Sequence, residues 1–284
     1  MRFSKYHGCG NDFIIVDETK GQRTPDDERS RLAKLLCDRH FGVGADGLIF
    51  IETADGTDGA MRLFEPAGNE ADMCGNGLRC VASYISDNIA SGKELLTIMT
   101  RDGIKKVTRK GEGFEVDMGE VRFARKHLSQ YVSDSGDPDD SMLEFPLECC
   151  GSVRSGSILN TGEPHIVLFE DDISIVDVVS AGVEVNSDRD RFPKNVNLNF
   201  VQIDGPGAIS IRTYERGVFD ETLACGTGAT ASAAAAILKG MVRERSVDVT
   251  TRGGALTIRL GEDHRAHMTG PAVRVFSGAL DLSR

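Results

Sequence analysis

Two short stretches organise this chain: ADMCGNGLR at residues 71–79 and LACGTGA at residues 223–229. Each contains a cysteine, then a Gly-x-Gly segment, and then residues that favour a helix. We therefore expect Cys74 and Cys225 to lie at helix N-termini, where the macrodipole and the unpaired backbone N–H groups favour a negative charge. Such a position lowers a thiol pKa from about 8.5 towards neutrality, and the glycines let backbone amides approach an anion closely. A substrate carboxylate held between two such helix starts would have one thiol on each side.

The two cysteine stretches belong to a longer internal repeat. The matching positions, at offsets of 150 to 152 residues, are Gly10 and Gly162, Phe41 and Phe192, Glu65 and Glu215, and Cys74 and Cys225. Four matches in the same order at a nearly constant offset indicate two homologous halves. We expect one half to span residues 1–122, completed by a C-terminal strand over 273–284, and the other to span 123–272. A pseudo-twofold relation would bring the cysteines to one interdomain cleft, a usual place for a ligand.

The composition narrows the class of protein. The chain has 284 residues and a net charge of −11, from 33 basic and 44 acidic residues. This balance argues against nucleic acid and anionic membranes as partners. No apolar run approaches the length that spans a membrane. Seven cysteines, an odd number, without a secretion signal favour reduced thiols in the cytoplasm.

Local patterns predict paired strands and at least three helices. Strands with glycine-containing turns are expected over residues 3–17, 95–119 and 247–272. Thr24 and Pro25 predict the cap and the first residue of a helix that continues through an acidic turn.

The helices that follow the two cysteines differ in composition. The first has apolar residues at helical spacing after Cys74 and is expected to end at Gly92. The second, after Cys225, is rich in alanine on several faces, so we expect a sheet to enclose it.

Several motifs together resemble the diaminopimelate epimerases over nearly the whole chain. They are HGCGNDF at 7–13, MCGNGLRC at 73–80, NTGEPH at 160–165, YERG at 214–217 and ETLACGTGA at 221–229. The resemblance implies an α/β (α+β) fold of two domains, each a mostly antiparallel sheet curled around a central helix. It implies catalysis on a small amino acid substrate without pyridoxal phosphate or metal. A homodimer is the expected assembly.

The resemblance also implies a role for each site residue. One cysteine, as thiolate, removes the α-proton, and the other, as thiol, returns a proton to the opposite face. His165 and Glu215 flank the two thiols and tune their protonation. Arg216 matches the arginine that holds the far carboxylate of the substrate. The substrate-binding residues expected are Asn11, Glu65, Gly75, Asn76, Glu163, Asn197, Arg216, Gly226 and Thr227.

Two positions depart from the family pattern. Glu65 and Glu163 stand where diaminopimelate epimerases usually have an asparagine that binds the substrate. A carboxylate there repels a distal carboxylate unless it is protonated or paired with Arg216, and it attracts a distal cation.

Three functions therefore remain open. The first is an epimerase that interconverts LL- and meso-2,6-diaminopimelate in lysine biosynthesis. The second is a racemase of a basic amino acid (histidine, lysine or arginine) with the same two-thiol mechanism. The third is a non-catalytic amino-acid-binding module, which would need only one carboxylate-binding helix start.

Overall fold

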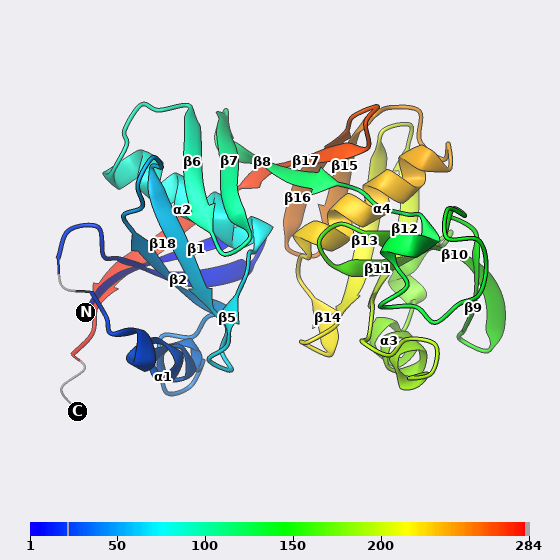
Figure 1. Ribbon diagram of the computed structural model, residues 1–284, viewed down its shortest axis with the longest axis horizontal. Helices are drawn as coiled ribbons and strands as arrows, with labels where there is room; N and C mark the ends of the chain where they lie inside the picture. The colour runs from blue at the N-terminus through cyan, green and yellow to red at the C-terminus, as the bar shows by residue number, and fades with distance from the viewer. Residues whose placement is uncertain (22, 282–284) are drawn as a thin grey trace. The chain divides into compact units, whose positions relative to one another are not determined.

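The computed structural model describes residues 1–21 and 23–281 and divides into two compact units (Figure 1). Unit 1 comprises Met1–Asp117 and Thr269–Arg284, and unit 2 comprises Met118–Met268. The domain boundaries expected at 122/123 and 272/273 lie within a few residues of this division and stay predictions. The last residues of the expected C-terminal strand, 282–284, lie outside the described part of the chain.

The described part of unit 1 contains two helices and a sheet. Its elements are β1 (Arg2–Gly8), β2 (Asn11–Asp17), α1 (Asp26–Cys37), β3 (Gly47–Glu52), β4 (Gly59–Phe64), β5 (Glu70–Ala71), α2 (Gly75–Asn88), β6 (Leu95–Thr100), β7 (Gly103–Lys110), β8 (Gly113–Glu120), which continues into unit 2, and β18 (Val273–Ala279).

Unit 2 repeats the plan after a short η1 turn (Arg125–His127). Its elements are β9 (Phe145–Cys149), β10 (Ser152–Asn160), β11 (Pro164–Phe169), η2 (Ile173–Ile175), α3 (Val178–Ser187), β12 (Asn197–Gly205), β13 (Ala208–Glu215), β14 (Asp220–Thr222), α4 (Gly226–Leu238), β15 (Ser246–Thr251), β16 (Gly254–Leu260) and β17 (Arg265–Pro271), which continues into unit 1.

The strand pairings of the two units correspond one to one. In unit 1, β2 pairs in parallel with β3 and β4 with β6, while β1–β2, β3–β4 and β6–β7 are antiparallel. In unit 2, β11 pairs in parallel with β12 and β13 with β15, while β10–β11, β12–β13 and β15–β16 are antiparallel. Each unit is therefore a mostly antiparallel sheet with two parallel pairs at equivalent places.

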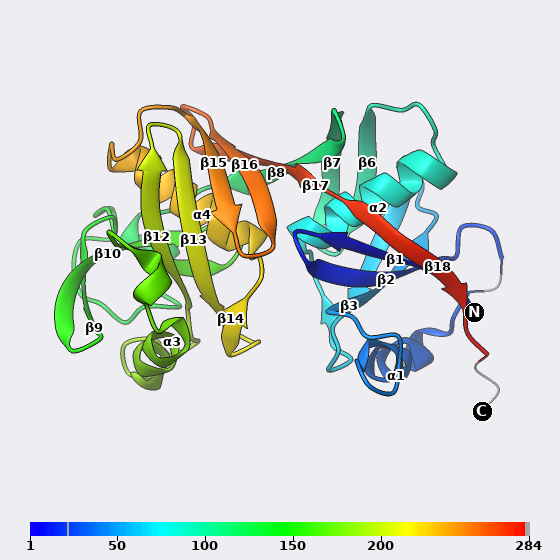
Figure 2. The ribbon, with the colours of Figure 1, turned by 180° about the vertical axis from the view of Figure 1, so that it is seen from behind.

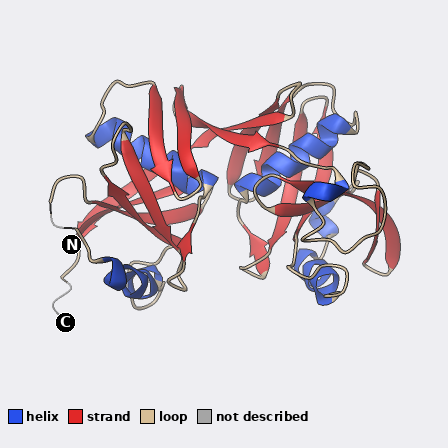
Figure 3. Ribbon diagram, in the orientation of Figure 1, coloured by secondary structure: helices blue, strands red, loops and turns tan. Residues whose placement is uncertain are grey.

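A buried helix lies against the sheet of each unit (Figure 3). In α2 every residue from Gly75 to Ser83 is buried, and the helix contacts β1, β2, β4, β7 and β18. In α4 all the alanines are buried, and the helix contacts β10 to β13, β15 and β16. Small side chains on every face let strands approach the helix from several directions. The expected fold class, a sheet curled around a central helix in each half, is confirmed.

The outer helix of unit 1 begins differently from the prediction. Pro25 occupies the cap position of α1, with φ −55° and ψ 140°, and no side chain caps the helix. The predicted Thr24 cap is wrong because the helix begins only at Asp26, which places Pro25 at the cap position. The backbone N–H of Thr24 donates to Glu18 Oε1 at 2.7 Å. Leu32, Leu36 and their neighbours on one face of α1 then pack into the core beside β3.

The predicted end of α2 at Gly92 is also wrong. The helix ends at Asn88, and the backbone N–H of Ile89 closes the last turn on Ile85 O at 2.9 Å. Gly92, with φ +81°, forms the turn beyond the helix.

The C-terminal strand returns to the first strand of the chain, as Figure 2 shows in red beside dark blue. β18 pairs antiparallel with β1, with Arg2 opposite Ala279 and His7 opposite Val273. The N-terminal ammonium of Met1 donates to Leu280 O at 2.7 Å. Both ends of the described chain are thereby fixed in unit 1. Among the described residues, no helix is long and apolar enough to cross a membrane.

Candidate active site

Each unit starts its buried helix at a cysteine. Cys74 occupies the cap position of α2 with extended backbone (φ −140°, ψ 121°), and its carbonyl accepts from Leu78 N at 2.8 Å. Cys225 has the same position on α4 (φ −111°, ψ 111°), and its carbonyl accepts from Ala229 N at 2.8 Å. Neither thiol caps its own helix. Both cysteines therefore lie at the positive end of a helix dipole, where an anion is stabilised.

A chain of amides orients the cysteine of unit 1. The thiol of Cys74 lies 3.7 Å from Asn11 Oδ1, which also accepts from Asn76 Nδ2 at 3.1 Å. Asn11 Nδ2 donates to Asp46 Oδ2 at 2.8 Å, which fixes the orientation of the amide. Arg79 Nη2 donates to Asn76 Oδ1 at 2.9 Å. The predicted residues Asn11, Cys74 and Asn76 are thus brought together by two residues that sequence reasoning missed.

Ion pairs fix the two aspartates beside this amide chain, Asp12 and Asp46. Asp12 binds Lys5 Nζ at 2.7 Å and Arg39 Nη2 at 2.8 Å, and Arg39 also reaches Asp46 at 2.7 Å. Burial acts to raise the pKa of Asp12, but the hydrogen bonds from Arg39 and Lys5 outweigh it and the pKa falls. Asp46 is thereby held where it accepts from Asn11.

Near its start, α2 carries a buried guanidinium, that of Arg79. Arg79 is fully buried and donates from Nε to Pro271 O at 3.2 Å. Burial lowers its pKa, and it also hydrogen-bonds Cys9. Burial raises the pKa of the Cys9 thiol, which fits a structural role for that cysteine.

Glu65 also belongs to unit 1. It is exposed in the turn after β4, where its backbone N–H donates to Asn69 O at 2.9 Å and its carbonyl accepts from Gly68 N at 2.8 Å. The side chain therefore occupies a tight, solvent-facing turn.

The cysteine of unit 2 is more enclosed. Cys225 is buried, and its Sγ lies 3.4 Å from Thr227 Oγ1. A Cβ atom on Gly228 would lie 2.6 Å from Asn199 Oδ1 and 3.4 Å from Cys225 Sγ. Only a glycine therefore lets the first turn of α4 approach the strand that carries Asn199.

His165 lies between two asparagines of the neighbouring strand. Its Nδ1 is 3.2 Å from Asn199 Nδ2, and its Nε2 is 3.4 Å from Asn197 Nδ2. The histidine is completely buried, and burial, together with the charge of Arg216, lowers its pKa to about 3 although Asn199 opposes the shift. His165 is therefore neutral at physiological pH.

Asn199 was missed by the sequence analysis. It lies two residues beyond Asn197 on β12, and alternate residues of a strand share one face. That spacing is the signal that could have placed both amides on His165. Asn199 Oδ1 also accepts from Thr213 Oγ1 at 2.9 Å, so the residue links β11, β13 and the start of α4.

The distal part of the predicted site forms an ion pair. Arg216 donates from Nε to Glu163 Oε2 at 2.5 Å, and its Nη2 contacts the same oxygen. The backbone N–H of Arg216 donates to Asn197 Oδ1 at 2.8 Å. Glu215 ends β13 directly before Arg216. Unit 2 therefore brings Glu163, Asn197 and Arg216 together.

One group among the described residues has the ligand atoms of a metal site. Cys149, Cys150 and Glu184 place these atoms within 4.8 Å of one another, at the end of β9, in the β9–β10 turn and on α3. Structural zinc takes four protein ligands, so this set is one short. Burial raises the pKa of Cys149 to about 12.

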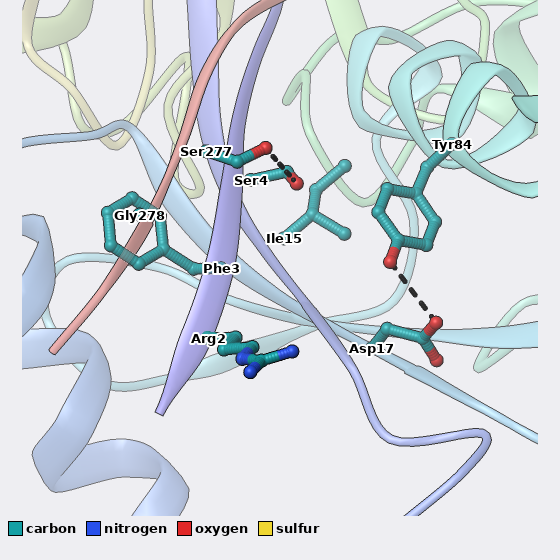
Figure 4. Close-up of a pocket in the computed structure, with 8 residues that line it drawn as sticks. All are labelled: Arg2, Phe3, Ser4, Ile15, Asp17, Tyr84, Ser277 and Gly278. Atoms are coloured by element: carbon teal, nitrogen blue, oxygen red, sulfur yellow. Dashed lines mark hydrogen bonds between the residues drawn. The ribbon is translucent and has the colours of Figure 1, made fainter. Parts of the chain in front are cut away.

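A pocket of about 320 Å³ in unit 1 lies apart from the predicted residues (Figure 4). It is lined by Arg2, Phe3, Ser4, Ile15, Asp17, Tyr84, Ser277 and Gly278. Four of its polar side chains pair with one another, because Tyr84 Oη donates to Asp17 Oδ2 at 3.1 Å and Ser4 Oγ lies 2.9 Å from Ser277 Oγ.

Comparisons with known proteins place these features in a family. The sequence profile described as Diaminopimelate epimerase matches residues 3–124 and 157–275. The chain is 39% identical to the diaminopimelate epimerase of Methanothrix thermoacetophila, over 99% of this chain and 96% of that one. It is also 39% identical to the diaminopimelate epimerase of Archaeoglobus fulgidus, over 100% and 97%.

Solved structures share the fold at low identity. A phenazine biosynthesis protein of the PhzF family from Bacillus anthracis aligns with a TM-score of 0.72 at 15% identity, covering 99% of each chain. A hydroxyproline epimerase from Agrobacterium vitis, with bound trans-4-hydroxy-L-proline, aligns with a TM-score of 0.68 at 15% identity, covering 98% of this chain and 90% of that one.

Proposed function

The chain belongs to the diaminopimelate epimerase family, and from that premise we propose that it is a cofactor-independent isomerase. It interconverts LL- and meso-2,6-diaminopimelate by two-base proton transfer, in lysine biosynthesis. The observation that carries the proposal is the repeated geometry, in which each unit starts a buried helix at a cysteine followed by Gly-x-Gly. A binding module needs one such helix start, whereas inversion at a carbon needs a base and an acid.

The two thiols exchange roles with the direction of the reaction. The thiolate of one cysteine takes the α-proton, and the thiol of the other gives a proton to the opposite face of the α-carbon. The reverse reaction starts from the swapped protonation state, so no net proton is gained or lost. Negative charge that develops on the substrate carboxylate is stabilised by backbone N–H groups of Gly75 and Asn76 and of Gly226 and Thr227.

The other site residues position these groups. Asn11 orients Cys74 and the substrate, and Asn197 fixes the backbone of Arg216. His165, which is neutral, and Glu215 act beside the thiols. Glu163 and Arg216, and by the family resemblance Glu65, are the residues proposed to recognise the distal end of the substrate.

A racemase of a basic amino acid is the second candidate. The observation that favours it is the pairing of Arg216 with Glu163, because a guanidinium that already holds a carboxylate attracts a distal carboxylate less strongly. Histidine, lysine and arginine lack a distal carboxylate, so they do not need Arg216.

The cellular location and the partners of the enzyme are proposed from the composition of the chain. The acidic chain and its cysteines favour a cytoplasmic protein that binds neither nucleic acid nor membrane. A homodimer is the proposed assembly, which light scattering on the purified chain tests directly.

The test is deuterium incorporation at the α-carbon, measured in D₂O with reductant. The panel contains LL- and meso-diaminopimelate, histidine, lysine, arginine and glutamate. Exchange confined to diaminopimelate supports the first candidate, and exchange with a basic amino acid instead supports the second. Cys74→Ala and Cys225→Ala are expected to abolish epimerisation, while Cys150→Ala, at an exposed cysteine outside the site, retains it. Epimerisation that survives in either of the first two variants contradicts the two-thiol mechanism.

A further inference from the structure

The guanidinium of Arg216 is held on three sides. Its Nε and Nη2 both donate to Glu163 Oε2, and its Nη1 donates to Lys194 O at 3.2 Å. Its Cζ lies over the ring of Tyr131, 5.5 Å from the ring centroid. A carbonyl, a ring and a carboxylate therefore fix the side chain within unit 2.

The Nε–Nη2 edge is the one that binds a carboxylate side-on. Two N–H groups point in parallel along this edge, which matches the geometry of a carboxylate better than the geometry of a single acceptor. Glu163 occupies this edge with one oxygen. A second carboxylate that binds Arg216 side-on must first displace Glu163.

The position of Glu163 allows its carboxylate to separate from Arg216. Its side chain is 45% exposed, whereas that of Arg216 is 24% exposed. It follows Gly162, a turn residue with φ +99° around which a Cβ atom would meet nothing within 4 Å. The carboxylate therefore exchanges a half-exposed ion pair for water at small cost.

We propose that Glu163 is an internal competitor for Arg216, which the distal carboxylate of the substrate displaces when it binds. The inference rests on the proposed function, because it takes Arg216 as the group that receives that carboxylate. Glu163 is then a specificity-determining residue that acts through Arg216. It weakens the recognition of a distal carboxylate relative to a distal ammonium, because the unliganded pair carries no net charge.

The experiment compares KM and kcat for LL-diaminopimelate between the wild-type chain, Glu163→Gln and Glu163→Ala. Removal of the competitor is expected to lower KM about two- to fivefold, the range of a half-exposed ion pair, while kcat stays within about twofold. Glu170→Gln is the matched control, because Glu170 forms a half-buried ion pair with Arg154 elsewhere in the same unit. Its KM is expected to be that of the wild type.

Each other result overturns the inference. A higher KM in both variants would mean that Glu163 binds the substrate ammonium directly. An unchanged KM would mean that Arg216 does not select the distal end through this edge, and a fall in kcat alone would mean that Glu163 supports the chemistry. Absence of α-proton exchange with LL-diaminopimelate in the wild-type chain is a separate outcome, which refutes the proposed function and the inference together.

Discussion

Asn199 anchors the imidazole of His165 from the neighbouring strand. Its Nδ2 donates to Ile166 O at 3.0 Å and its Oδ1 accepts from Thr213, so the amide presents a donor to His165 Nδ1 at 3.2 Å. The amide Nδ2 of Asn197 faces the other ring nitrogen, Nε2, at 3.4 Å, so an asparagine lies beside each nitrogen of the imidazole. Burial, the main cause, lowers the pKa of this histidine to about 3.

This neutral histidine makes stability depend on pH. Above about pH 6.5 the residue is neutral in both the folded and the unfolded chain, and it adds no pH dependence. As the pH falls from 6.5 towards 3, the unfolded chain takes up a proton that the folded chain does not, so folding loses about 1.4 kcal/mol per pH unit. His165→Gln is expected to remove this slope, as measured by urea unfolding between pH 4.5 and 7. The exposed control His127→Gln keeps the slope, and equal slopes in both variants would contradict the assignment.

Gly228 sets the approach between α4 and β12. Gly228→Ala would place a Cβ atom 2.6 Å from Asn199 Oδ1, which hydrogen bonds hold in place. Overpacking of this kind costs about 1–3 kcal/mol, and we expect that loss in the free energy of unfolding. Gly205→Ala, at the end of the strand that carries Asn199, is the control, since nothing lies within 4 Å of the added atom. A loss of similar size in both variants would contradict the steric explanation.

Asn11 controls the charge next to Cys74. Asn11→Asp would replace an amide oxygen 3.7 Å from the thiol by a carboxylate, which also faces Asp46. A nearby negative charge disfavours a thiolate, so the reaction of Cys74 with iodoacetamide at pH 7 is expected to slow by about tenfold. Mass spectrometry of the alkylated peptide measures the rate. The exposed control Asn69→Asp should react at the wild-type rate, and an unchanged rate in Asn11→Asp would exclude this electrostatic coupling.

A buried ion pair stabilises the outer helix of unit 1. Arg29 Nη2 lies 2.8 Å from Glu18 Oε2 and 2.5 Å from Glu52 Oε1, and the Arg29 and Glu18 side chains are almost inaccessible. Arg29→Met would leave two carboxylates without their cation and is expected to cost about 3–5 kcal/mol in urea unfolding. Arg31→Met, which removes an exposed pair with Glu28 on the same helix, should cost less than about 1 kcal/mol. Equal costs would show that burial does not decide the effect.

The sequence predicted the elements whose signals are local. The Gly-x-Gly segments after Cys74 and Cys225 placed both helix starts, because caps and helix-opening glycines are written in a few neighbouring residues. The alanine composition of α4 predicted its enclosure by a sheet. Thr24 and Gly92 failed as boundary signals because α1 begins after Pro25 and α2 closes its last turn at Ile89, before it reaches Gly92.

The sequence by itself thus determined the repeated plan of the two halves and the position of a cysteine at each helix start. Only the tertiary structure decided three contacts: Asp46 accepts a hydrogen bond from Asn11, Asn199 hydrogen-bonds His165, and Glu163 forms an ion pair with Arg216. These contacts join residues 34 to 53 positions apart in the chain. Their partners are selected by which strands pair and in which register, and spacing along the sequence does not specify that choice.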